Sequence, residues 1–229
     1  MKTIKVIIPA YNEEKSIAQV IYEIPDRVEE IIVVSNNSTD ETIENAKKAG
    51  ATVLSENRAG YGNACLKGID YISQQKIKPD IVVFIDGDYS DYPEELLKLT
   101  APIINNDIDF VIGARVKELR EVGSMTEQQI FGNWFATFLM KWLFASKFTD
   151  LGPFRAIKYD KLIELQMSDK TYGWTVEMQL KALKQGLTYE EIQVRYRKRI
   201  GISKVSGTVN GTVMAGIKII GWIAKYSFK

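Results

Sequence analysis

The sequence contains no histidine. This absence excludes the usual histidine-based zinc sites and the Ser-His-Asp triads of many hydrolases. A metal site in this chain must therefore use carboxylates, carbonyl oxygens or water, and a general base is expected to be Asp or Glu. The chain has one cysteine, Cys65, so no intrachain disulfide can form, which suits a cytoplasmic protein.

An excess of one charge and long apolar runs are also lacking. The 229 residues carry a formal net charge of +1, so no overall field draws the protein to nucleic acid. No stretch reaches the ~20 apolar residues that span a bilayer. The two nearest, residues 130–145 and 213–224, are interrupted by Asn133 and Lys141 and by Lys218. The N-terminus has the pattern of a strand entering a polar turn, not of a signal peptide. We expect a globular chain, with one large domain or two small ones.

The most informative stretch is residues 81–93, IVVFIDGDYSDYP. Five apolar residues predict a buried strand. Asp86 and Asp88 follow at its carboxyl end, where open α/β sheets bind their ligands. Two carboxylates at this spacing suit Mg²⁺ or Mn²⁺, and such a metal suits a diphosphate. Taken alone, the stretch is equally compatible with a solvated Asp-Gly turn after a core strand.

The first half of the chain alternates between apolar and amphipathic segments. Strands are predicted at residues 2–9, 30–34, 51–54 and 81–85. Amphipathic segments separate them, and a further helix is predicted at residues 93–103. This alternation predicts a parallel, doubly wound sheet with right-handed crossovers.

The second half of the chain does not continue this regular alternation of strands and helices. We expect a strand at 110–112, a mobile polar excursion at 117–129 and a turn at 150–155. A helix at 177–185 and a strand at 189–196 follow, and a basic loop spans 195–204. The last element is an amphipathic helix that holds Val213, Ile217, Ile220 and Ile223. Within this half of the chain, one helical face gathers Trp134, Phe135, Phe138, Leu139, Trp142 and Leu143. Core packing is the expectation for this face. A helix lying on a membrane surface is the alternative, because Trp and Phe are in excess and lysines flank them.

Several segments in this order resemble a family 2 glycosyltransferase of the GT-A fold. They are VIIPAYNEE at 6–14, VVSNNSTDET at 33–42, the Gly-x-Gly turn at 60–62, Asp-Gly-Asp at 86–88 with Pro-Glu after it, and IGAR at 112–115. The tail, residues 150–156 followed by Arg199-x-Gly201-x-Ser203-Lys204, is similar to the polyprenyl-phosphate (dolichol-phosphate) mannosyl- and glucosyltransferase branch.

The resemblance implies a fold and a separate function for each half of the chain. The fold would be α/β, a GT-A, Rossmann-like, doubly wound and mostly parallel sheet flanked by helices, with C-terminal amphipathic helices. Residues 1–229 would form a single domain. Its half at 1–115 would bind the nucleotide sugar, and its half at 116–229 would bind the acceptor and carry a basic lid loop.

The resemblance also implies the donor site. Asp86 and Asp88 would hold Mg²⁺ or Mn²⁺ against the diphosphate, and glycines at 201 and 207 would let the basic loop close. The residues implied in donor binding are Pro9, Ala10, Tyr11, Glu13, Ser35, Asn36, Asn37, Arg58, Gly62, Asp86, Arg199, Ser203 and Lys204. The family's usual acid in the second turn is replaced by Ser35-Asn36-Asn37, so UDP and GDP both stay open.

The implied reaction is a single inverting displacement that moves a hexose to a polyprenyl phosphate. Arg115 would grip the acceptor phosphate, Asp150 would act as base or position the sugar, and Glu177 would be a second acid. The ordinary alternatives are a turn residue for Asp150 and a helix-surface acid for Glu177. A second acceptor arginine, common in the family, is absent, since Glu127, Gln128 and Gln129 precede Phe131.

Other readings of the chain stay open. The alternative acceptor is a soluble sugar, a glycerate-like molecule or a glycan, and the alternative class is a non-catalytic nucleotide-sugar or membrane-associated binding module. A Rossmann dehydrogenase is disfavoured because no G-x-G-x-x-G follows the first strand. We expect a cytoplasmic protein, peripheral on the inner membrane surface where the acceptor is lipid. The sequence is compatible with a homo-oligomer and predicts no nucleic-acid partner.

Overall fold

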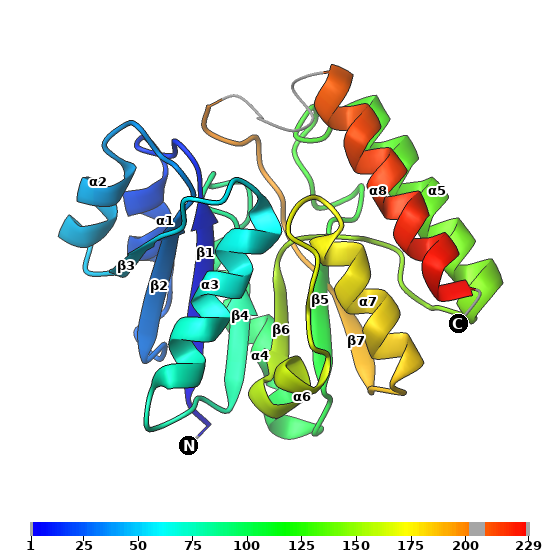
Figure 1. Cartoon of the computed structure of the whole chain (residues 1–229), viewed down its shortest axis with the longest axis horizontal. Coiled ribbons are helices and arrows are strands. Elements are labelled where there is room, and N and C mark those ends of the chain that lie inside the picture. Colours follow the sequence, from blue (N-terminus) through cyan, green and yellow to red (C-terminus); the bar gives the residue numbers. More distant parts are fainter. Residues whose placement is uncertain (1, 202–208, 228–229) are drawn as a thin grey trace.

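A computed structural model describes residues 2–201 and 209–227. Its centre is a mixed sheet in the order β3-β2-β1-β4-β6-β5-β7 (Figure 1). The strands are β1 (Ile4–Ala10), β2 (Glu30–Ser35), β3 (Thr52–Ser55), β4 (Ile81–Phe84), β5 (Phe110–Ala114), β6 (Arg155–Lys158) and β7 (Tyr189–Gln193). Strand β6 runs antiparallel to both of its neighbours, and the other pairs are parallel.

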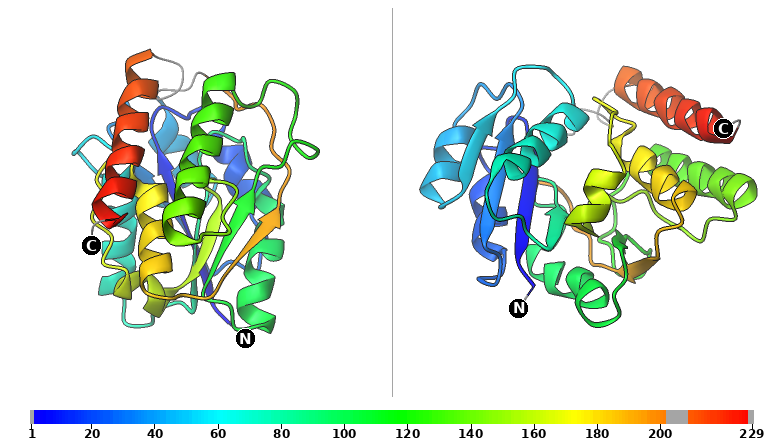
Figure 2. Two further views of the ribbon diagram at one scale, coloured as in Figure 1. Left: turned by 90° about the vertical axis from the view of Figure 1, so that its right-hand side faces the viewer. Right: turned by 60° about the horizontal axis from the view of Figure 1, so that its bottom comes forward.

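Helices cover both faces of the sheet, as the two views in Figure 2 show. One face packs against α1 (Ile17–Glu23), α2 (Thr42–Lys48) and α4 (Leu96–Asn105), which follows the short 3₁₀ helix η1 (Pro93–Glu95). The other face packs against α3 (Tyr61–Gln74), α5 (Glu127–Phe144), α6 (Tyr159–Glu164), α7 (Trp174–Lys184) and α8 (Val209–Ser227). Successive strand residues point to opposite faces, so a sheet covered on both sides needs unbroken apolar strands. In β4, Val82 and Phe84 join one core, and Ile81 and Val83 join the other.

The sheet is mostly parallel, as expected, and one strand, β6, departs from the parallel arrangement. The sequence reading placed a turn at residues 150–155, and β6 begins at the end of that segment. Because β6 runs antiparallel, its first residue, Arg155, pairs with the last residue of β4, Phe84. The segment before β6 consequently lies beside the carboxyl end of β4, next to the Asp86 turn. This inserted strand is what brings Asp150 to the same edge of the sheet as the two metal-site candidates.

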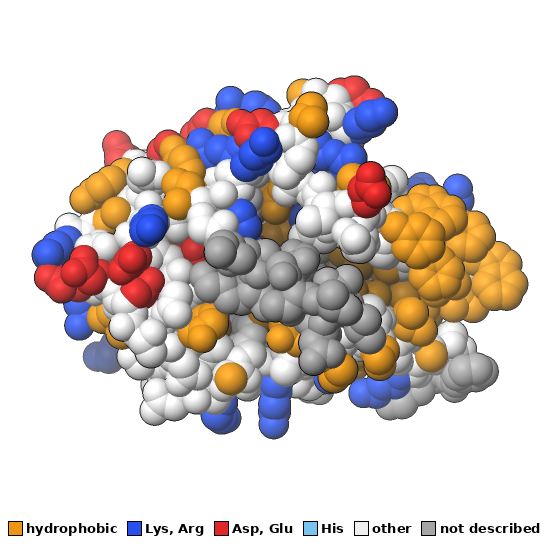
Figure 3. All heavy atoms as spheres, turned by 90° about the horizontal axis from the view of Figure 1, so that it is seen from above, with side chains coloured by type: hydrophobic (Ala, Val, Ile, Leu, Met, Phe, Trp, Pro, Cys, Tyr) orange, Lys and Arg blue, Asp and Glu red, His pale blue; other side chains and the backbone are white. Residues whose placement is uncertain are grey.

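The aromatic face of α5 is exposed, so the expectation that it packs in the core is wrong for most of its members. Trp134, Phe138 and Trp142 are 56%, 51% and 76% exposed, and Phe131 one turn earlier is 63% exposed. Hydrophobic side chains accordingly gather on the right-hand side of Figure 3. The opposite flank of the helix, with Ala136 and Met140, is the one that packs inward.

Helix α5 begins at Glu127, inside the segment 117–129 that was predicted to be a mobile polar excursion. A capping box between Thr126 and Gln129 starts the helix at Glu127, so residues 127–129 are helical. The final helix is present as predicted, with Trp222 and Ile223 buried against the core; the Val213 side chain lies outside the described residues. Among residues 2–201 and 209–227, no helix combines the length and apolar character needed to cross a bilayer.

Candidate active site

A cavity of about 340 Å³ lies at the carboxyl edge of β1, β2 and β4. It collects most of the residues predicted to bind the donor: Pro9, Ala10, Tyr11, Glu13, Asn36, Asn37, Asp86, Asp88 and Arg199. They come from the ends of parallel strands and the turns after them, because these ends meet at one edge of the sheet. The structure thus brings together three turns, at residues 9–13, 36–37 and 86–88, that are far apart in the sequence.

Asp86 and Asp88 share the floor of this cavity. Asp86 Oδ1 accepts a hydrogen bond from Tyr61 Oη (2.9 Å), and Asp88 Oδ1 accepts bonds from Ser90 N (2.9 Å) and Ser90 Oγ (2.5 Å). Burial, together with the charge of Asp88, raises the pKa of Asp86 to about 6. Because both carboxylates line the same cavity, they can act on one ligand.

A third carboxyl group, that of Asp91, lies close to the same turn. It is 2% exposed, and neither of its oxygens has a hydrogen-bond partner within the described part of the chain. Burial first, and then the charges of Asp86 and Asp88, raise its pKa well above the ordinary value. Asp91 is therefore a buried carboxyl group with a raised pKa beside the Asp86 turn, and the sequence analysis did not single it out.

The residues at the cavity floor fit a hard divalent ion. Asp86 and Asp88 supply carboxylate oxygens, and a cation between them would relieve the repulsion that raises the pKa of Asp86. Among the described residues, no group of three or more His, Cys, Asp or Glu side chains is placed to hold a metal by itself. The remaining ligands must then be water or substrate oxygens, which is how Mg²⁺ is commonly held at phosphate sites.

Arg199 closes the cavity from the side of the basic loop. Its Nη1 lies 3.2 Å from Asp88 Oδ2, and its Nη2 donates to Glu13 Oε1 at 3.2 Å. The loop is fastened over the metal-site turn, because Arg197 N donates to Ser90 O and Ile200 N donates to Asp88 O, each at 2.9 Å. Ser203 and Lys204, with Gly207, lie outside the described residues.

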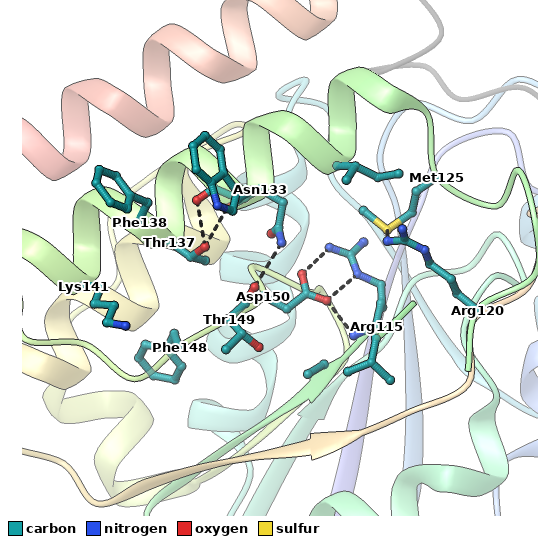
Figure 4. Close-up of a pocket in the computed structure, with 14 residues that line it drawn as sticks. Arg115, Arg120, Met125, Asn133, Thr137, Phe138, Lys141, Phe148, Thr149 and Asp150 are labelled. Atoms are coloured by element: carbon teal, nitrogen blue, oxygen red, sulfur yellow. Dashed lines mark hydrogen bonds and ion pairs between the residues drawn. The ribbon is translucent and has the colours of Figure 1, made fainter. Parts of the chain in front are cut away.

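Arg115 and Asp150 form a buried pair, shown in Figure 4. Arg115 donates from Nε to Asp150 Oδ2 (2.9 Å), from Nη2 to Oδ1 (2.6 Å) and from its backbone N to Oδ2 (2.7 Å). Burial alone would raise the pKa of Asp150, but the Arg115 guanidinium outweighs it and lowers that pKa. Both oxygens of Asp150 are occupied, so the arrangement favours a carboxylate that orients Arg115 over one that removes a proton.

Other predicted residues lie off the cavity walls. Glu177 is fully buried, and its carboxylate accepts bonds from the backbone N of Ser168 and Asp169, so it does not reach the site and supports a loop instead. Ser35 is buried at the end of β2. The Arg58 side chain is 70% exposed, pairs with Glu56 at 2.8 Å and is not among the residues that line the cavity.

Tight packing explains Gly62 and its neighbour Gly60. A Cβ on either glycine would collide with the backbone of residues 169–170, so each glycine allows a close approach of two chain segments. The sequence reading missed Tyr61 and Tyr172, which line the cavity. Tyr61 stands inside the noted glycine turn, whereas nothing in the sequence around Tyr172 signals a site.

A second and larger cavity, of about 880 Å³, opens from the same carboxylates. It shares Tyr61, Asp86, Asp88, Tyr172 and Arg199 with the first cavity and continues past Arg115. Its far walls come from α5 and α8 and are largely apolar, including Phe131, Phe135, Ala136, Ile219 and Ile220. The site is therefore a polar chamber joined to an apolar one, with Asp86 and Asp88 at the junction.

Comparison with known proteins points in one direction. A family model described as Glycosyl transferase family 2 matches residues 5–166. An uncharacterized glycosyltransferase of Mycobacterium tuberculosis is 32% identical over 220 residues, covering 93% of this chain and 94% of that protein. The dolichyl-phosphate hexose transferase of Haloferax volcanii is 28% identical over 214 residues, covering 91% and 89%.

Among solved structures, glucosyl-3-phosphoglycerate synthase from Mycobacterium tuberculosis, in complex with Mn²⁺, UDP and glucosyl-3-phosphoglycerate, has a TM-score of 0.77. The match covers 99% of this chain and 80% of that chain at 22% identity. At this identity the likeness concerns the fold, and it confirms the expected GT-A architecture.

Proposed function

The chain belongs to glycosyltransferase family 2 and is a glycosyltransferase; from this premise we propose that it transfers a hexose, with inversion, from a nucleotide-diphosphate sugar to a polyprenyl phosphate at a membrane surface. The single observation that carries the acceptor class is the continuity between two chambers. The polar cavity with Asp86 and Asp88 opens into an apolar one between α5 and α8. A phosphate on a long apolar chain has the same two-part chemistry.

The donor fits the polar chamber. The turns at Pro9–Glu13 and Asn36–Asn37 would receive the nucleoside, and Arg199 would meet the diphosphate with charge-assisted hydrogen bonds. Asp86 and Asp88 would hold Mg²⁺ or Mn²⁺, which as a Lewis acid neutralises charge on the leaving nucleoside diphosphate. The structurally similar glucosyl-3-phosphoglycerate synthase was solved in complex with Mn²⁺ and UDP, which supports the same donor chemistry here.

In the reaction, a phosphate oxygen of the acceptor bonds to the anomeric carbon of the sugar as the bond from that carbon to the donor diphosphate breaks. The acceptor is already an anion and needs no strong base, so the chain's task is to position it. Arg115 lines the large cavity next to Asp86 and is held by Asp150 in a fixed orientation. We assign Arg115 to the acceptor phosphate and Asp150 to the orientation of Arg115.

The exposed aromatic face of α5 supports peripheral membrane contact. Phe131 both lines the large cavity and is exposed on that face, so the apolar chamber and the apolar surface are continuous. Trp134, Phe138 and Trp142 extend the surface, and exposed Lys141 stands among them. Apolar rings with a neighbouring cation match the interface of an anionic bilayer.

A donor and acceptor screen tests the proposal. Thermal shift with UDP and GDP, with Mn²⁺ and with chelator, should show stabilisation that needs the metal, because a ligand of the native state raises stability by mass action. Nucleoside diphosphate release should then need a polyprenyl phosphate presented in detergent or vesicles. Equal turnover of a water-soluble acceptor without phosphate, such as a free sugar, would remove the lipid acceptor and favour the soluble alternative.

A further inference from the structure

One short loop, residues 168–173, lies between the donor cavity and helix α8. In Figure 1 it is the yellow loop ahead of α7 that reaches the start of α3. Lys170 O accepts a hydrogen bond from Asn63 N (3.0 Å), and the backbone of the loop lies so close to Gly60 that a Cβ would not fit between them. Tyr172, from the same loop, lines both cavities. The loop is therefore a wall of the donor site.

The other side of the loop holds α8 through one carboxylate. Asp169 Oδ2 accepts a hydrogen bond from Trp222 Nε1 (2.6 Å) and lies 3.2 Å from Lys218 Nζ. Asp169 Oδ1 accepts bonds from the backbone N of Thr171 (2.7 Å) and Gly173 (3.1 Å). One oxygen thus orders the loop, and the other fastens the helix to it. Asp169 is 2% exposed and Trp222 8%, so both are shielded from competing water.

Packing confirms that the contact is specific. A Cβ on Gly173 would overlap the Trp222 indole and crowd Asp169 Oδ2, so only glycine leaves room for the ring. The base of the loop is fixed separately, because Glu177 accepts from the backbone N of Ser168 (3.0 Å) and Asp169 (2.7 Å). These bonds to the loop explain why the Glu177 carboxylate is buried.

Helix α8 meets the other substrate chamber as well. Gly216, Ile219 and Ile220 line the large apolar cavity, while Met214 and Ile217 are 56% and 62% exposed. The same helix therefore contacts the apolar chamber with one part of its length and the donor-site loop, through Trp222, with another. Both partners of Asp169 Oδ2, Trp222 and Lys218, belong to α8, so a shift of the helix away from the loop would remove them together.

We propose that Asp169 and Trp222 are positioning residues that couple helix α8 to the donor cavity, so that seating of α8 against residues 168–173 sets the affinity for the donor. This inference rests on the proposed function, since it takes the donor to be a nucleotide-diphosphate sugar. Coupling between two sites is reciprocal, so donor binding must also hold α8 more firmly in place.

The test uses the full chain and isothermal titration with Mn²⁺ and UDP or GDP. Trp222→Phe keeps an aromatic ring and removes the N–H donor; we expect nucleotide affinity to fall roughly 5- to 10-fold, the range of a modest coupling. Gly173→Ala displaces the indole from the other side and should give the same loss. Tyr22→Phe, at an exposed aromatic residue of α1, is the control and should bind as wild type does.

Hydrogen exchange supplies a readout that a purely structural contact would not move. In the wild type, nucleotide with Mn²⁺ should slow the exchange of amides at residues 219–226, and in Trp222→Phe it should not. Variants that are less stable but bind nucleotide within about 1.5-fold of wild type would overturn the coupling. If the wild type binds neither UDP nor GDP, the proposed donor and the coupling fall together; loss of the coupling alone leaves the proposed function in place.

Discussion

The Arg199 guanidinium lies 3.2 Å from the Asp88 carboxylate, in the position where a metal ion would compete with it. The same guanidinium donates to Glu13, and its Nε is buried without a hydrogen-bond partner among the described residues. A donor diphosphate would offer Arg199 new acceptors as the metal takes Asp88. Arg199 thus contacts Asp88 in this structure, and under the proposed function it would contact the donor diphosphate in the complex.

Replacing Arg199 should change metal and donor binding in opposite directions. Arg199→Gln removes a competing cation from Asp88, so Mn²⁺ affinity without nucleotide should rise two- to fivefold. Affinity for UDP or GDP with saturating Mn²⁺ should fall at least tenfold, because charge-assisted bonds to phosphate are lost. Titration of Mn²⁺ by electron paramagnetic resonance and calorimetry of the nucleotide measure the two. A parallel fall in both would contradict this account.

The stability of the metal-free protein should depend on the ionisation of Asp86. Its pKa in the folded chain, about 6, lies above the ordinary value of 3.8. A raised pKa gives stability that is complete below about pH 4 and is lost as pH rises through 6. Urea unfolding with chelator should show a loss of about 1–2 kcal/mol over this window, allowing for cavity water. Asp86→Asn should flatten this step, and an unchanged profile in that variant would oppose the assignment.

Breaking the Arg115–Asp150 pair should be costly to the fold. The two side chains are 11% and 6% exposed, so Asp150→Ala leaves a buried guanidinium without its partner. We expect a loss of about 3–5 kcal/mol in the free energy of unfolding, measured by urea denaturation. The double variant Arg115→Met with Asp150→Leu should recover much of that loss but remain inactive. A single-variant cost below about 1 kcal/mol would show that the pair is not holding Arg115.

The aromatic face of α5 should determine vesicle binding without affecting the fold. Trp134→Ser with Trp142→Ser changes exposed side chains, so thermal stability should stay close to wild type. Sedimentation with anionic vesicles should fall severalfold, because indole rings supply the apolar contact. Tyr22→Ser on α1, 69% exposed on the other face of the sheet, is the control and should leave binding unchanged. Equal sedimentation of both variants would place the membrane contact elsewhere.

Features that depend on neighbouring residues could be predicted from the sequence, and contacts between distant residues could not. The Asp86 turn stands directly after an apolar strand, and the fold brings it to the Pro9 and Asn36 turns because parallel strand ends share one edge. Strand β6 was missed because Arg155–Lys158 is short, charged at both ends and without strand alternation. Tyr172 and the Asp169–Trp222 contact depend on residues far apart in the chain, which periodicity does not register.

The exposed face of α5 shows a second limit of sequence-based prediction, which concerns burial. Its apolar spacing predicted a helix correctly, yet spacing alone does not tell whether an apolar face meets the core or the outside. Glu177 shows the reverse case: an acid in a helix looked like a surface or catalytic group, and the structure buries it against backbone N–H groups. Both distinctions depend on tertiary packing.

The most direct test of the central claim is nucleoside diphosphate release by Asp88→Asn compared with wild type, with UDP-glucose or GDP-mannose, Mn²⁺ and a polyprenyl phosphate. Asp88 is 5% exposed and bonded to Ser90, so the amide should fold with a similar circular dichroism spectrum. We expect release by the wild type that chelator abolishes, and a loss of at least 100-fold in the variant. Release by Asp88→Asn at the wild-type rate would contradict a metal-dependent transferase centred on this turn.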